Sequence, residues 1–179
     1  TTQDFVWAMS TAGEIDLTQF EETWYHQERT PGLKINWFFD PINKTFRLDT
    51  EQIIEKNTHG ETQRPFFYPL SLALFDNLGN QYSLKLLDSD SQNRISDGIL
   101  IISKDRESFV FQNISTEPKV SYNRSFSAPI KIISDWIDTA FLMQYETDGF
   151  ARYEAAQQYA LSVIYDTIDG KWISSSYIS

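Results

Sequence analysis

The sequence contains no cysteine, only two histidines and only seven glycines among its 179 residues. The missing cysteines exclude disulfide scaffolds, thiol nucleophiles and cysteine-ligated zinc. The glycines are not grouped, so the chain has no glycine-rich loop to cradle a phosphate. Basic residues are also scarce: 15 Lys and Arg face 25 Asp and Glu, which gives a formal net charge of −10. An acidic body repels phosphate backbones and anionic membrane surfaces, which argues against nucleic-acid and membrane partners.

Long apolar runs are missing as well. No stretch approaches the ~18 residues of a membrane span, and residues 1–10 do not have the pattern of a signal peptide. The absence of cysteine leaves the cellular compartment open. Apolar residues make up 41% of the chain and aromatic residues 15%, so it can bury a core and form one domain, or one domain with attached pieces of its neighbours.

The two ends of the chain have helical periodicity. Residues 3–12 place Phe5, Ala8, Met9 and Ala12 on one face, and Gly13 stands where a helix C-cap is expected. A second short helix follows Asp16, which is a good N-cap with Gln19 three residues later. After Pro129 the helical period returns, with Ser134 and Asp148 as the expected N-caps of two helices that together extend to Tyr165.

The middle of the chain has the alternating pattern of β-strands. Residues 33–39 and 45–49 predict a hairpin, residues 66–75 predict a central strand, and the turn at Asp76–Asn80 predicts that Tyr82, Leu84 and Leu86 form its partner strand. Three more short strands are expected at 99–102, 108–112 and 120–126. About seven short strands with frequent turns predict a mainly β fold: a small immunoglobulin-like antiparallel β-sandwich with N- and C-terminal helical segments.

A complete active site is not evident in this pattern. A helical zinc-peptidase motif needs two histidines one turn apart, but Thr30 lies four residues after His26 and Gln63 four residues after His59. A Gly-x-Ser-x-Gly elbow is absent. The segment that begins at Asp88 resembles a calcium loop only at its start, because the twelfth position is Ile99 and not Glu. The sequence therefore predicts no catalytic, cofactor-binding or metal-binding residue in this chain.

The aromatic residues permit two interpretations. Five tryptophans and nine tyrosines on a sandwich would suit a carbohydrate-binding module, in which sugar rings stack on exposed aromatic rings. The simpler interpretation is that Trp37, Phe66 and Phe111 fill the core, while Trp7, Trp24 and Trp136 pack the helices onto another surface. Short isolated helices are marginal in water, so we expect the helical segments to pack on neighbours. Three residues are expected on such interdomain faces: Trp7, Trp136 and Tyr153.

Several stretches, in order along residues 4–160, resemble the aminopeptidase N family of zinc metallopeptidases, particularly its bacterial branch. They are Asp4–Met9, Trp24–Gln27, Leu74–Gly79, Phe109–Ile114, Arg124–Ile130, and Asp148 with Arg152–Gln157. The resemblance implies three parts: residues 1–28 as the end of a catalytic domain, residues 29–129 as a β-sandwich linker domain, and residues 130–179 as the start of a C-terminal helical domain.

The family's zinc motif and substrate-binding motif are not in this chain. The resemblance therefore implies a non-catalytic linker segment of a zinc-dependent aminopeptidase, with the zinc bound outside this segment. Its expected partners are the neighbouring domains of the parent chain, and self-association through exposed helix faces is a further expectation. A free-standing module that binds carbohydrate or protein is the alternative. A hydrolase of another kind would need a cluster of convergent titratable groups.

Overall fold

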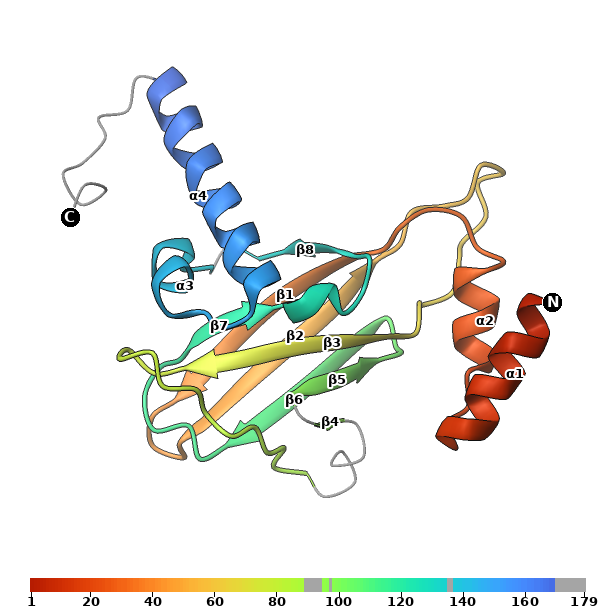
Figure 1. Ribbon diagram of the computed structural model, residues 1–179, viewed down its shortest axis with the longest axis horizontal. Helices are drawn as coiled ribbons and strands as arrows, with labels where there is room; N and C mark the ends of the chain where they lie inside the picture. Colours follow the sequence, from red (N-terminus) through yellow and green to blue (C-terminus); the bar gives the residue numbers. More distant parts are fainter. Residues whose placement is uncertain (89–94, 97, 135–136, 170–179) are drawn as a thin grey trace.

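A computed structural model describes residues 1–88, 95–96, 98–134 and 137–169. Two four-stranded sheets pack face to face, with the strand orders β6-β2-β1-β8 and β4-β5-β3-β7. Helices α1 and α2 lie at one end of this sandwich, and helices α3 and α4 lie at the opposite end (Figure 1). The mainly β, immunoglobulin-like sandwich with flanking helices that the sequence predicts is therefore confirmed.

The first sheet is built on the predicted hairpin. Strand β1 (Gly32–Asp40) pairs antiparallel with β2 (Thr45–Ile53) over nine residue pairs, and β2 pairs antiparallel with β6 (Arg106–Gln112). Because side chains alternate across a strand, Phe46 and Leu48 point into the core. On the outer face of β1, Phe38 is exposed and packs under the guanidinium of Arg47.

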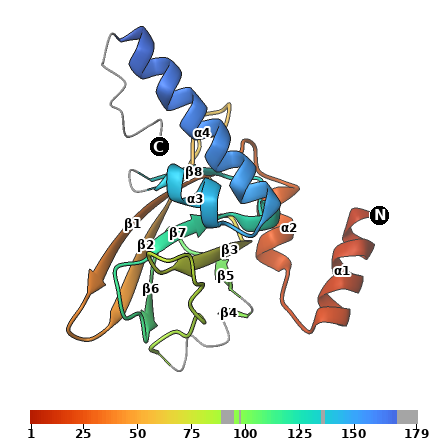
Figure 2. The same cartoon turned by 60° about the vertical axis from the view of Figure 1, so that its left-hand side comes forward.

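The second sheet is organised around β3 (Tyr68–Phe75). This strand pairs antiparallel with both β5 (Ile99–Ile102) and β7 (Lys119–Tyr122), so it is the central strand that its apolar run predicts. The short β4 (Ile95–Ser96) pairs with β5 at the edge. Both faces of the second half of β3 are buried, because its outer face packs against the C-terminal helices. The sheet therefore carries one core inside the sandwich and a second core beneath α3 and α4 (Figure 2).

The segment after the Asp76–Asn80 turn departs from the prediction. Tyr82, Leu84 and Leu86 were expected to form a strand beside β3, but the segment pairs with β3 only at its start, through a bridge between Phe75 and Gln81. It then crosses to the other sheet, where Leu86 bridges to Phe111 in β6. The alternation correctly marks the side chains that pack on the core, but the backbone changes its hydrogen-bonding partner between the two sheets.

The N-terminal helices are α1 (Thr2–Gly13) and α2 (Thr18–Trp24). Helix α1 begins with a capping box between Thr1 and Asp4. Its C-cap is Glu14, which takes the left-handed conformation, whereas Gly13 remains helical. The predicted glycine cap is therefore displaced by one residue. Asp16 accepts a hydrogen bond from the Thr18 N–H at the start of α2, but Leu17 occupies the N-cap position.

The chain after Pro129 differs from the prediction at its start. Residues expected to lead into a helix form β8 (Lys131–Ile133), a parallel edge strand beside β1. Helix α3 (Thr139–Tyr145) begins only at Asp138, whose side chain accepts the Phe141 N–H, so the N-cap is Asp138 and not Ser134. Asp148 caps α4 (Gly149–Ile168), as predicted. A short 3-10 turn, η2 (Arg124–Phe126), joins β7 to this region. Within the described residues, no helix is long and apolar enough to cross a membrane.

Candidate docking faces and the joint between sandwich and helix

The described residues contain no group of three or more His, Cys, Asp or Glu side chains that could hold a metal ion. His26 and His59, the two histidines weighed as ligands, are both exposed. Asp88 is exposed, while most of the calcium-like segment that follows it lies outside the described residues. The most distinctive features of the described residues are two helical arms: an N-terminal arm of α1 and α2, and a C-terminal arm of α3 and α4.

The N-terminal arm is anchored to the sandwich through α2. The side-chain amide of Gln19 donates to the carbonyl oxygens of Pro65 and Ser103, at 2.9 and 2.7 Å. The indole N–H of Trp24 donates to the Phe67 carbonyl at 2.7 Å, and its ring packs edge-on against Phe66 with centroids 4.9 Å apart. Because these bonds tie half-buried side chains to backbone groups, they fix α2 in one orientation on the sandwich.

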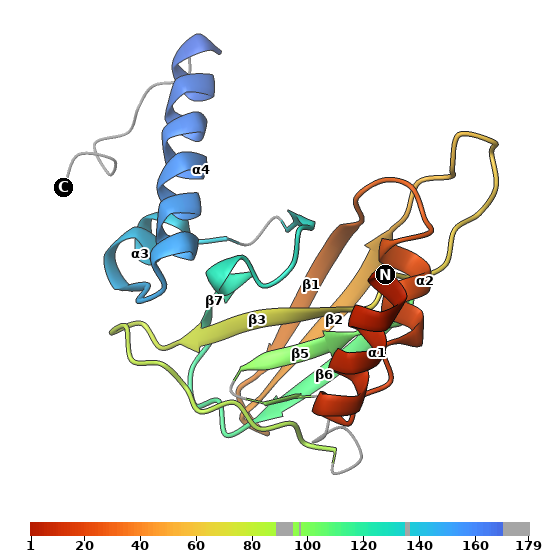
Figure 3. The ribbon, with the colours of Figure 1, turned by 45° about the vertical axis from the view of Figure 1, so that its right-hand side comes forward.

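Helix α1 lies beside α2 (Figure 3), and three of its large apolar side chains are exposed. Val6 is its one buried residue, while Phe5, Trp7 and Met9 are 60%, 71% and 51% exposed. Exposed apolar side chains in a group mark surfaces that contact a partner, whereas isolated ones are ordinary. Phe5 and Met9, four residues apart, share one face of α1, whereas Trp7, two residues from each, points to nearly the opposite side. The structure thus leaves Trp7, the first residue expected on an interdomain face, exposed but apart from that pair.

At the other end, a buried ion pair joins the sandwich to the C-terminal helices. The Arg124 guanidinium donates to Glu146 Oε1 through Nε at 3.2 Å and Nη2 at 3.0 Å, and it also donates to Thr147 Oγ1 at 2.9 Å. The side chain of Glu146 is fully buried and that of Arg124 is 17% exposed. The backbone N–H of Asp148 donates to the same Glu146 oxygen at 2.7 Å. This pair binds η2 to the turn between α3 and α4.

Asp148 adds a second tie across the same joint. One of its carboxylate oxygens accepts the N–H groups of Ala151 and Ser125, and the other accepts the Ser125 hydroxyl at 2.6 Å. Burial raises the pKa of this carboxyl, but the bonds from Ser125 and Ala151 outweigh burial and hold the pKa below its ordinary value of 3.8. The residue thus caps α4 and ties that helix to the sandwich. Ser125 takes a left-handed backbone conformation with φ 56° to reach it.

The turn at the end of β3 completes the joint. Gly79 has φ +86° and lies against Tyr145 at the end of α3, where a Cβ atom would fall 2.2 Å from the ring. Only glycine fits this combination of positive φ and close approach. Beneath α3 and α4, Phe75 and Ala73 pack with Leu142 and Ala155 in the second core. The direction in which α4 leaves the sandwich is therefore set by contacts within this chain.

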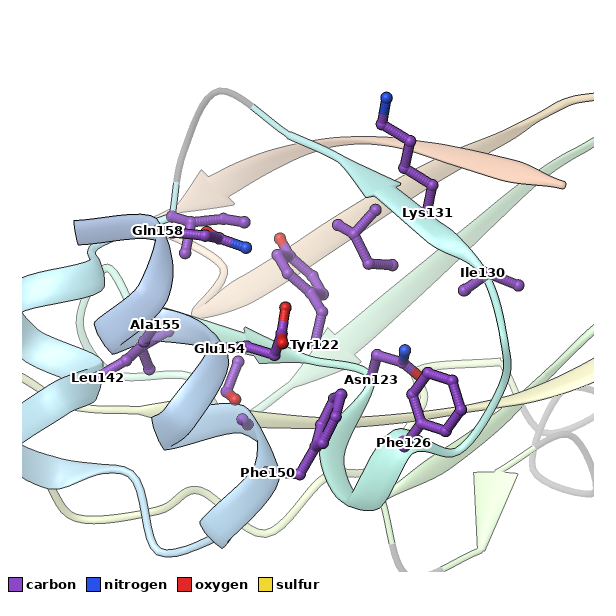
Figure 4. Close-up of a pocket in the computed structure, with 14 residues that line it drawn as sticks. Tyr122, Asn123, Phe126, Ile130, Lys131, Leu142, Phe150, Glu154, Ala155 and Gln158 are labelled. Carbon is purple, nitrogen blue, oxygen red and sulfur yellow. The ribbon is translucent and has the colours of Figure 1, made fainter. Parts of the chain in front are cut away.

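A groove of about 560 Å³ lies between α4, η2 and β8 (Figure 4). Phe126 and Phe150 stand at one end with ring centroids 5.2 Å apart, and Lys131, Glu154 and Gln158 also line the groove. Apolar walls with a few polar groups suit the side chains of a protein partner as well as a small ligand. The first turns of α4 form one wall of the groove, through Phe150, Glu154 and Gln158.

Helix α4 projects away from the sandwich beyond this groove (Figures 1 and 3). Ala151 and Ala155, in its first two turns, are its only buried residues. Tyr153, another residue expected on an interdomain face, is 59% exposed. Trp136, the third, lies outside the described residues. The projecting helix therefore presents most of its surface without a partner from the described part of the chain.

The carbohydrate-binding alternative requires a row of exposed aromatic rings on a sheet. Among the described strand residues, Phe38 is the one large aromatic side chain that is exposed. Phe66 and Phe111 are buried in the core, as the simpler interpretation expected, and Trp37 is half-buried against it. One ring does not make a stacking platform, so the described surface does not favour sugar binding.

The sequence did not indicate the ion pair at the joint. Arg124 and Glu146 are 22 residues apart and stand in no recognised motif, and each looks like an ordinary surface charge. Asp148 carried a signal, because an aspartate directly before a helical stretch is a typical N-cap. Its second role toward Ser125 depends on tertiary contact and has no sequence signature.

Comparison with known proteins gives these features a context. Residues 29–135 match a family described as a domain of unknown function (DUF3458) with an Ig-like fold. The chain is 29% identical over 159 residues to aminopeptidase N of Escherichia coli (strain K12) and 31% identical over 159 residues to aminopeptidase N of Haemophilus influenzae (strain ATCC 51907 / DSM 11121 / KW20 / Rd). Each match covers 88% of this chain and 18% of the relative.

A solved structure agrees with these matches. The crystal structure of Legionella pneumophila aminopeptidase A in complex with aspartic acid superposes with a TM-score of 0.77 and 27% identity, over 97% of this chain and 18% of that one. The chain thus spans about 18% of the length of the relatives it matches, and the resemblance to the aminopeptidase N family is confirmed. The chain belongs to the DUF3458 family of Ig-like domains and corresponds to the segment of aminopeptidase N-like proteins that carries this domain.

Proposed function

We propose that this chain is the non-catalytic linker of a longer, zinc-dependent aminopeptidase. On this proposal residues 1–28 end the catalytic domain, residues 29–129 form the linking sandwich, and residues 130–179 begin a helical domain. The parent enzyme would remove N-terminal amino acids from peptides. The described residues do not provide the donor set of a zinc site, so the metal would be bound elsewhere in the parent.

One observation carries this proposal: each arm is tied to the sandwich by hydrogen bonds and leaves several large apolar side chains exposed. Gln19 and Trp24 fix α2 to the sandwich, and Arg124 and Asp148 fix the start of α4. A domain that only binds a small ligand has no need of rigid arms with uncovered apolar surfaces. A domain that sets the distance and angle between two neighbours needs both, because rigid anchoring transmits orientation and apolar faces bury against the neighbours.

The test is a footprint of the longer protein. Trp7 and Tyr153 are 71% and 59% exposed in this chain, so hydroxyl radicals should oxidise both readily. In the longer protein, we expect both side chains to be protected by neighbouring domains. Phe38, on the outer face of β1 and 57% exposed, serves as an internal control for general accessibility. Equal oxidation of Trp7 and Tyr153 in the two proteins would refute the linker role.

An activity measurement accompanies the footprint. The chain alone, supplied with zinc, should release no product from an aminoacyl p-nitroanilide, whereas the longer protein should hydrolyse it. In the longer protein, Trp7→Asp should lower activity or stability because it places a charge in an apolar interface. Ile42→Asp, at a position that is 89% exposed on the β1–β2 turn, should leave both unchanged. Hydrolysis by the chain alone would contradict the proposal.

A further inference from the structure

The groove between α4, η2 and β8 has a buried hydroxyl at its floor. Ser121, in β7, is fully buried and lines the groove. Its register partner in β3 is Ala73, which belongs to the core beneath α3 and α4, so the Ser121 side chain lies on that same face of the sheet. Among the described residues, no group forms a hydrogen bond with its Oγ atom. An unpaired hydroxyl in the interior costs free energy, and a ligand in the groove would supply the missing partner.

One wall of the groove combines an aromatic ring, a carboxylate and an amide. Phe150, Glu154 and Gln158 follow one another at intervals of four residues along α4. They therefore line up on one face of the helix, with successive Cβ atoms about 6 Å apart. The Phe126 ring lies against Phe150, with the two ring centroids 5.2 Å apart. The aromatic end of the groove is thus about one helical turn from the carboxylate.

The charge inside the groove is negative. Figure 4 shows the Glu154 carboxylate directed toward Tyr122, within the groove, and the Lys131 amine directed away from it. Glu154 has no ion-pair partner among the described residues. The formal net charge of the whole chain is −10, so its electrostatic field attracts cations. A carboxylate without a counterion, next to aromatic rings, suits an ammonium group attached to an apolar body.

The face of α4 expected to meet a neighbouring domain is a different one. Tyr153 lies two residues from Ala151 and two from Ala155, the residues of this helix that are buried. Residues two apart on a helix point to nearly opposite sides, because each residue turns the helix by about 100°. Tyr153 therefore points away from the sheet and from the groove, so docking through Tyr153 leaves the groove open.

We propose that the groove binds a small aromatic amine, in which a primary ammonium is joined to a ring by two carbon atoms. The ring packs against Phe126 and Phe150, and the ammonium donates hydrogen bonds to the Glu154 carboxylate and the Ser121 hydroxyl. The two-carbon link separates nitrogen and ring by about the distance between side chains one helical turn apart. The groove has a volume of about 560 Å³, which is in the range of small-molecule sites.

Titration of the 179-residue chain with 2-phenylethylamine, followed by NMR, tests this site. We expect a dissociation constant on the order of 1 mM, because so small a ligand makes few contacts. Glu154→Gln should weaken binding roughly tenfold because it removes the counterion. Glu117→Gln removes the same charge from an exposed position that does not line the groove, so it should change the constant by about twofold at most. 3-Phenylpropionate, with a carboxylate in place of the ammonium, should not bind.

Ser121→Ala separates a role in binding from a role in the fold. It should weaken binding of 2-phenylethylamine roughly threefold, because one hydrogen bond is lost. Its melting temperature should stay the same or rise, because the variant removes a buried hydroxyl that has no partner in the free chain. A lower melting temperature would show that the hydroxyl serves the fold, and would contradict its place in the site.

Two further results would overturn the site. Equal losses in Glu154→Gln and Glu117→Gln would reduce the binding to a general attraction between a cation and an acidic chain. Binding to the 179-residue chain but not to the longer protein would mean that a neighbouring domain occupies the groove. Neither result bears on the linker role, because the footprint of Trp7 and Tyr153 in the longer protein tests that role separately.

Discussion

Replacement of Arg124 by Met is the sharpest test of how the sandwich holds its C-terminal helices. The variant keeps most of the apolar stem but removes the guanidinium that donates two hydrogen bonds to Glu146 and one to Thr147. The Glu146 carboxylate is then left fully buried, with only the Asp148 N–H as a described donor. A buried charge without its counterion is costly because protein replaces water around it.

The magnitude follows from the burial of the pair. Loss of one partner of a buried ion pair costs ~3–5 kcal/mol. Since Arg124 is 17% exposed and one donor to Glu146 remains, we expect the lower end, about 3 kcal/mol. With an m-value of ~2 kcal/mol/M, the urea midpoint should fall by about 1.5 M.

Urea titrations followed by circular dichroism measure this loss, and two further variants interpret it. The double variant Arg124→Met with Glu146→Leu removes both charges and should recover most of the stability. Arg47→Met removes a surface pair in which Arg47 is 52% exposed and Asp49 is 34% exposed, so it should cost less than ~1 kcal/mol. If Arg124→Met costs no more than Arg47→Met, or if the double variant is no better than the single one, the buried pair does not hold the joint.

Three further predictions concern the joint and the core. Gly79→Ala should lower the melting temperature by several degrees, because the added Cβ would fall 2.2 Å from the Tyr145 ring at a residue with φ +86°. The further change Tyr145→Ala should restore part of the lost stability. If it restores none, the Tyr145 ring is not the obstacle. Burial raises the Asp148 pKa, but its hydrogen bonds hold it below 3.8, so the stability it adds is present above pH 3.8 and is lost as the pH falls through the folded-state pKa. Asp148→Asn should therefore be less stable than the wild type at about pH 7 and differ little at about pH 2.5 in urea titrations, and a constant difference would contradict this. Leu72→Ala, at a fully buried position, should lower the free energy of unfolding by ~2–5 kcal/mol. Ile42→Ala, on the surface, should change it by less than ~0.5 kcal/mol. Thermal denaturation compares the two variants, and equal losses of stability would contradict the core position of Leu72.

The β1–β2 hairpin illustrates what a local pattern can predict. The alternation of Leu33 and Ile35, and of Phe46 and Leu48, indicated which side chains face inward, and all four are buried. The polar turn between them fixed their antiparallel pairing, because the two strands are only a few residues apart. Helix caps at Thr1 and Asp148 are equally local, since a cap bonds to backbone groups within three residues.

The errors occur where a distant partner decides the structure. Residues 131–133 became a parallel edge strand because Pro31 and β1, about 100 residues earlier, offer backbone groups to pair with. The Leu86 segment kept its buried side chains but moved its hydrogen bonds to β6. Alternation reports that one face is buried, and it contains no information about which strand lies alongside.

The amino-acid sequence by itself determined the class of the fold, the central place of β3, and the absence of the family's zinc motif, because each depends on composition or on neighbours in the chain. Only the tertiary structure decided how the arms are held. The buried pair of Arg124 and Glu146, the second bond of Asp148 to Ser125, and the fit of Gly79 against Tyr145 each join residues from separate elements. Their energies arise from burial and close approach, which exist only once the sandwich and helices have packed.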